Sequence, residues 1–102
     1  MYHLLTSDEF DAQEAYRIGF VQEVVPAGTQ LERALEIAEL IASQAPLAVQ
    51  ATKASSRRFV EEGFADAARE LGPTQQRLLA SDDADEGVRS FIERRKAVFK
   101  GA

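Results

Sequence analysis

Apolar residues at helical spacing, set between helix caps, recur through most of this 102-residue chain. The clearest case is "TQLERALEIAELIASQAP", in which Thr29 and Glu32 have the spacing of a capping box. One apolar stripe along this helix consists of Leu31, Leu35, Ala38, Ala42 and Ala45. Three flanking apolar residues, Ile37, Leu40 and Ile41, widen it. A stripe this wide predicts burial on more than one side.

A shorter helix is predicted from about Asp11 to Ile18. Asp11 is a candidate N-cap, Glu14 stands three residues later, and Gly19 supplies a left-handed stop. A helix of this length is not stable by itself in water, so it must pack on something.

Three further segments have helical patterns. Pro46 suits the first position of "PLAVQATKASSRRFVEEG", whose small residues allow close helix packing. "FADAARELGPTQQRLLAS" keeps helical spacing, but Gly72-Pro73 predicts a kink or a fresh start. The last segment, "SDDADEGVRSFIERRKAVFKG", has acidic residues at its start and cations at its end, which complement a helix dipole. Its predicted apolar face is Ala84, Val88, Phe91, Ile92 and Phe99.

One segment favours extended structure. The β-branched residues of "FVQEVV", Phe20 to Val25, end at Pro26 and have no matching strand elsewhere in the sequence. We interpret it as a connector, or as an edge that pairs with something outside the chain. The predicted fold class is therefore mainly α, with at least four helices and one short extended segment, Phe20–Val25.

Composition excludes several classes of function. The formal charge of -5 opposes a dedicated nucleic-acid binder, and no apolar run approaches the about 20 residues that span a membrane. Without Cys there is no disulfide, thiolate nucleophile or Cys-based zinc site. The single His, His3, lies near an end and is more readily explained as incidental than as catalytic. These features predict a soluble cytoplasmic protein without a metal site, and no residue is predicted to be catalytic.

Two basic clusters remain to be explained. Lys53, Arg57 and Arg58 form one, which suits a solvated helix face or a contact with an anion or partner. Arg94, Arg95, Lys96 and Lys100 form the other, in "FIERRKAVFKG". That cluster suits a solvated helix end, a membrane or nucleic-acid patch, or a site for a phosphorylated ligand. The chain's acidity weakens the nucleic-acid reading, and the acidic residues earlier in the segment weaken the membrane one.

The order of four motifs carries a resemblance to a known family. "LLTSDEFDAQEAYRIGFVQEVVP", a capped helix, "APLAVQATK" and "DDADEGVRSFIERRKAVFKG" together closely resemble the C-terminal part of the enoyl-CoA hydratase/isomerase (crotonase) family. The resemblance covers essentially the whole chain. Ser7 departs from the family's usual Gly in the "LLTG" turn, which is costly if that position needs a positive φ, and Phe20 replaces a usual Leu.

The resemblance implies that residues 1–102 are a single C-terminal helical region of a crotonase-like fold. The family's N-terminal spiral of ββα turns, with its oxyanion hole and catalytic acids, has no counterpart in these residues. The full-length enzyme would act as a hydratase or isomerase on a coenzyme A thioester, with no tightly bound cofactor. The chain alone is expected to be inactive. The alternative is a stand-alone helical association module without an enzymatic role.

The resemblance also implies partners and a site. Family members assemble as trimers or as dimers of trimers, and the closing helix reaches the coenzyme A of another subunit. By motif position, Phe91 would lie near the adenine and Arg94 near a phosphate, on one helix face at i, i+3 spacing. The alternative for Phe91 is packing in a core or subunit interface, and Arg94 also suits a helix C-terminus.

Overall fold

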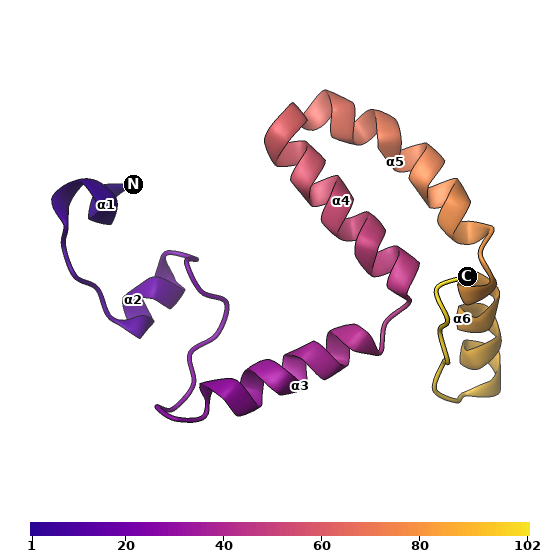
Figure 1. Cartoon of the computed structure of the whole chain (residues 1–102), viewed down its shortest axis with the longest axis horizontal. Helices are drawn as coiled ribbons and strands as arrows, with labels where there is room; N and C mark the ends of the chain where they lie inside the picture. Colours follow the sequence, from indigo (N-terminus) through magenta and orange to yellow (C-terminus); the bar gives the residue numbers. More distant parts are fainter. The chain divides into compact units, whose positions relative to one another are not determined.

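The computed structural model describes residues 1–102 and contains six α-helices (Figure 1). Their bounds are α1 Tyr2–Thr6, α2 Ala12–Arg17, α3 Gln30–Ala42, α4 Pro46–Glu62, α5 Phe64–Leu79 and α6 Asp82–Glu93. No strand is present. The predicted mainly α fold with at least four helices is confirmed. Residues 20–25 form no strand, so the predicted short extended segment is not confirmed.

The chain divides into two compact units, Met1–Glu36 and Ile37–Ala102. In the first unit, Asp11 caps α2 as predicted, because its carboxylate accepts the Glu14 backbone N–H at 2.8 Å. Gly19 follows the helix with φ 75°, the predicted left-handed stop. The five-residue helix α1 was not predicted; it ends at Ser7, which has φ 59°.

Aromatic rings gather in the first unit. The His3 ring lies 4.4 Å from that of Phe10, centroid to centroid, and Phe10 meets Phe20 edge to face at 5.9 Å. The Phe20 N–H donates to the carbonyl of Ala15 at 2.8 Å, which ties the segment after α2 back to that helix. Since His3 belongs to α1, this cluster connects that helix to Phe10 and Phe20.

The entry into α3 differs in detail from the prediction. The Thr29 hydroxyl donates to the Pro26 carbonyl at 2.9 Å instead of accepting an N–H of the helix. Arg33, one turn into the helix, pairs with Glu23 at 2.9 Å and with Glu36 at 2.8 Å, and both hydrogen bonds raise its pKa. A polar bridge to Glu23 therefore fixes the segment before α3.

In the second unit, α4 begins at Pro46 as predicted and packs against α5. A groove of about 740 Å³ runs between these two helices and is lined by small and hydroxyl side chains such as Ala51, Ser55 and Thr74. Of the kink or fresh start predicted at Gly72-Pro73, the fresh start is wrong, because α5 continues through Pro73, and the kink stays a prediction. The proline deprives the Arg69 carbonyl of its helical donor, and Arg69 lies exposed, where water can replace that donor.

Very little apolar surface is buried. Ala15 is the one hydrophobic residue in the buried class, and no large side chain is fully buried. The wide stripe of α3 was expected to be covered, yet Leu31 is 68% exposed and Leu40 64% exposed. That expectation is therefore not met within this chain.

Candidate functional site

The closing helix α6 ends earlier than the apolar pattern suggests. Ser81 caps its start by accepting the Ala84 N–H at 3.2 Å, and the helix stops at Glu93. Arg94 then adopts a left-handed conformation with φ 53°. Phe99 therefore lies outside the helix, and its predicted place on the α6 apolar face is wrong.

The end of α6 is a Schellman motif with an arginine at the position that glycine usually takes. The Arg94 N–H donates to the Phe91 carbonyl at 3.3 Å, and the Arg95 N–H donates to the Ser90 carbonyl at 3.1 Å. A non-glycine residue in this conformation costs roughly 1–2 kcal/mol. Contacts beyond the motif must therefore hold the turn.

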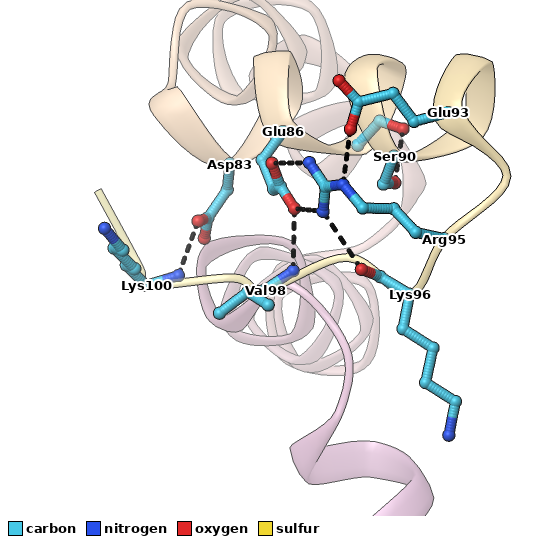
Figure 2. Close-up of polar contacts among 9 residues, drawn as sticks. Asp83, Glu86, Ser90, Glu93, Arg95, Lys96, Val98 and Lys100 are labelled. Atoms are coloured by element: carbon cyan, nitrogen blue, oxygen red, sulfur yellow. Dashed lines mark hydrogen bonds and ion pairs between the residues drawn. The ribbon is translucent and has the colours of Figure 1, made fainter.

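The first of these contacts is made by Asp83, which is 4% exposed. Its two carboxylate oxygens accept the backbone N–H groups of Lys100 at 2.7 Å and Gly101 at 2.8 Å. Its own N–H donates to the Ala102 carbonyl at 3.1 Å. The residues after α6 thus return alongside the helix to its first turn, as Figure 2 shows.

The second contact is made by Glu86 and Arg95. The guanidinium of Arg95 donates to both Glu86 oxygens at 2.5 and 2.9 Å, and Val98 N–H donates to Glu86 at 2.9 Å (Figure 2). Glu93 accepts a further bond from Arg95 at 2.6 Å. The Arg95 hydrogen bond, with help from the Val98 N–H, lowers the pKa of Glu86 to about 2. We call Asp83, Glu86 and Arg95, with the tail 94–102 that they hold, the tail clasp.

The tail clasp pairs one cation of the closing basic cluster and leaves the others unpaired. Arg95 is paired with two carboxylates, whereas no ion pair involves Arg94, Lys96 or Lys100. In Figure 2 the Lys96 side chain extends away from the clasp. Arg94, Lys96 and Lys100 are therefore the cations at this end of the chain that remain available for an anion.

Phe91 and Arg94, the two predicted site residues, are both on the surface. Phe91 is 85% exposed, so it is not part of a core within this chain. Arg94 is also exposed, but it follows the helix instead of lying on it. The i, i+3 spacing therefore does not by itself place Phe91 and Arg94 on one helix face. Whether either residue contacts coenzyme A remains a prediction.

The other candidate groups show less organisation. Arg58 of the second basic cluster pairs with Glu62 of its own helix at 3.3 Å and with Glu70 of α5 at 3.8 Å, so it is not a free cation. His3 stacks on Phe10, and its Nδ1 is buried without a hydrogen-bond partner. No three acidic or His side chains gather to hold a metal ion, and none of the helices has the length and apolar run of a membrane span.

The chain is similar over its whole length to known proteins. All of residues 1–102 match the profile of the family described as enoyl-CoA hydratase/isomerase. The 2,3-dehydroadipyl-CoA hydratase of Escherichia coli (strain K12) is 35% identical over 103 residues, which cover 96% of this chain and 38% of that protein. The carnitinyl-CoA dehydratase of Proteus mirabilis (strain HI4320) is 39% identical over 102 residues, with shares of 96% and 39%.

A solved structure agrees closely with the fold. A probable enoyl-CoA hydratase/isomerase from Mycobacterium abscessus superposes with a TM-score of 0.92 at 51% identity, covering 96% of this chain and 38% of that one. The chain thus spans about two fifths of the length of the relatives it matches. Since the family profile covers every residue, the chain belongs to the enoyl-CoA hydratase/isomerase family.

Proposed function

We propose that the chain is the C-terminal helical region of an enzyme that hydrates or isomerises acyl-CoA thioesters. The order of its motifs supports this position within the family. Both curated relatives described above carry a coenzyme A thioester in their names, which supports the substrate class. The region's own task is to associate with other parts of the assembly and to complete the coenzyme A pocket.

The observation that carries the association role is the exposed apolar surface. A chain of this size normally buries more than half of the surface of its unfolded form, yet Ala15 alone represents the hydrophobic core here. Leu35 and Ile41 on α3 are more than half exposed, as are Val88 and Ile92 on α6. Surface of this kind is stable when another protein surface covers it.

The pocket role rests on Phe91 and Arg94. An exposed phenyl ring offers a flat face on which an adenine can stack, and a free guanidinium binds phosphate through two parallel hydrogen bonds. Neither group can stabilise an enolate or move a proton at the thioester, so the chain alone is expected to be inactive. The chemical step would belong to an oxyanion hole and to acids that these residues do not provide.

Two measurements on the purified chain test this proposal. We expect no hydration of crotonyl-CoA above the buffer rate, and turnover well above it would contradict the assignment of roles. We expect coenzyme A to bind and Arg94→Ala to weaken that binding. Arg89→Ala is the matched control, because Arg89 is an exposed cation of α6 without an ion pair, and it should bind as the parent chain does.

The second candidate function is a stand-alone helical association module, and the uncovered stripe of α3 favours it. Small-angle scattering with mass determination examines it directly. A dimer or trimer that does not bind coenzyme A would support this alternative over the proposal that the chain is a region of an enzyme. A compact monomer would count against it.

A further inference from the structure

The tail clasp determines where α6 ends, and this follows from helix geometry. In a continuous helix, Glu86 and Arg95 would be separated by nine residues, which is about 13.5 Å along the axis and half a rotation around it. Their side chains would then point to opposite faces. The bidentate pair at 2.5 and 2.9 Å therefore requires the chain to leave the helix before Arg95.

The residue that makes this departure is Arg94, with φ 53°. It lies between Glu93, the last residue of α6, and Arg95, which the clasp holds. The direction of its side chain consequently depends on the turn and not on the helical repeat. If the clasp opened, α6 could continue through Arg94 and turn the guanidinium elsewhere, since arginine favours the right-handed helical conformation.

We propose that Asp83 and Glu86 are positioning residues, which hold the tail against α6 and thereby fix the side chain of Arg94 relative to Phe91. The proposal rests on the proposed function, because it assigns the purpose of this arrangement to binding the phosphoadenosine end of coenzyme A. Neither carboxylate touches the ligand. Asp83 acts through tail N–H groups, and Glu86 acts through the Arg95 guanidinium and the Val98 N–H.

Asp83 provides the longer-range part of this restraint. It is buried, and its carboxylate is satisfied entirely by tail N–H groups 17 and 18 residues away in sequence. A buried carboxylate deprived of such donors is unfavourable, so the helix start and the tail are mutually stabilising. Glu86 provides the part nearer the turn, through Arg95 and the Val98 N–H.

The charges at the turn are consistent with this arrangement. Pairing with the two carboxylates of Glu86 and Glu93 occupies Arg95, while Arg94 beside it has no ion pair. A phosphate approaching the end of α6 would thus meet the unpaired guanidinium of Arg94, with Phe91 one turn earlier on the helix.

The test uses the full chain, labelled for NMR and titrated with adenosine 3′,5′-bisphosphate, the phosphoadenosine part of coenzyme A. In the parent chain we expect the Phe91 ring and the Arg94 side chain to respond. In Asp83→Asn and Glu86→Gln, the Arg94 Cα and Cβ shifts should lose their left-handed values. Affinity should then fall about tenfold, as for the loss of one oriented charge-assisted hydrogen bond.

Two further variants separate positioning from loss of structure or charge. Asp85→Asn removes the same charge from the same helix, but Asp85 is exposed and its side chain makes no recorded hydrogen bond or ion pair, so binding should not change. Arg95→Lys lies outside α6 and keeps the charge but loses the guanidinium fork. It should reproduce the effect of Glu86→Gln while the shifts of α6 remain helical.

The outcomes distinguish the two levels of the argument. If Asp83→Asn, Glu86→Gln and Arg95→Lys displace Arg94 yet bind the bisphosphate like the parent chain, positioning is overturned and the proposed coenzyme A contact stands. If these variants leave the Arg94 backbone shifts unchanged, positioning is overturned as well. If the parent chain shows no response at Phe91 or Arg94, the proposed contact fails, and the positioning role fails with it.

Discussion

The first unit and the closing part of the second each contain a non-glycine residue in left-handed conformation, but different forces surround the two turns. Ser7 follows α1, the helix that contains His3, and the His3, Phe10 and Phe20 rings of that unit meet in tilted and edge-to-face contacts. Arg94 follows α6 inside a network of carboxylates and N–H donors. Ring contacts occur in the unit that contains the first turn, whereas ionised groups hold the second turn.

The difference indicates how each region responds to conditions. Ring contacts are short-ranged and depend little on salt, whereas the clasp needs ionised carboxylates and directional donors. The clasp therefore specifies one backbone geometry, while the aromatic cluster specifies only that three rings stay together. A region that must present a side chain in one direction gains more from the first arrangement.

The largest expected loss of stability comes from a substitution in the aromatic cluster of the first unit. Phe10→Ala removes the ring between His3 and Phe20 and should destabilise the first unit by about 2 kcal/mol, less than for a fully buried ring. Faster amide exchange at Phe20 and Val21 would report the loss, because both N–H groups bond to the Ala15 carbonyl.

Phe64→Ala is the matched control for this change. Phe64 is 75% exposed and makes no recorded ring contact, so its removal should leave the exchange of the first unit unaltered. Equal effects of the two variants would show that the aromatic cluster does not hold the unit together.

The next effect is a pH dependence confined to the clasp. Because the pKa of Glu86 in the folded chain lies at about 2, below its usual value near 4.5, the clasp is fully stabilised above pH 4.5. That stabilisation should be lost as the pH falls from 4.5 through 2. The Val98 amide shift, followed by NMR, should titrate with a midpoint near pH 2 in the parent chain and lose this response in Glu86→Gln.

A pH-independent Val98 shift in the parent chain would contradict the assignment of Glu86 as its acceptor. The first unit supplies an internal comparison, since the Phe20 N–H bonds to a carbonyl and no carboxylate is involved. The Phe20 amide shift should therefore not follow the titration of Glu86, either in the parent chain or in Glu86→Gln.

The smallest effects concern the turns themselves. Ser7→Gly and Arg94→Gly each relieve a left-handed strain and should stabilise their helix ends by about 1 kcal/mol. Amide exchange of the cap N–H groups measures both. Arg94→Gly should at the same time weaken coenzyme A binding, whereas Ser7→Gly should not. A helix end that loses protection in either variant would mean that its turn is not strained.

Local signals made much of the helical framework predictable. Asp11, Gly19 and Pro46 act within one helical turn of their position, so their roles could be inferred from the sequence and are confirmed. The cost of a strained turn at Ser7 was likewise foreseen as a condition on its φ. Pro73 misled because the penalty depends on whether the freed carbonyl meets water, which the sequence does not state.

The clasp could not be predicted, for a physical reason. Asp83 and Glu86 share their segment with Asp82 and Asp85, and a helix dipole accounts for all four equally well. What distinguishes Asp83 is a pair of N–H groups 17 and 18 residues later, and no periodic pattern carries such a contact. The cations after Glu93 prolonged the helical pattern, and so the true end of α6 was missed.

The grip of Asp83 on the tail is made to the main chain, and so is the hold of Glu86 on Val98. Such a contact recognises the course of the backbone and is indifferent to the side chains that the tail carries there. Positions 98 and 100 are thus free to vary in chemical character while the turn at Arg94 keeps its shape. Proline is excluded at 98 and 100, because it has no N–H to give.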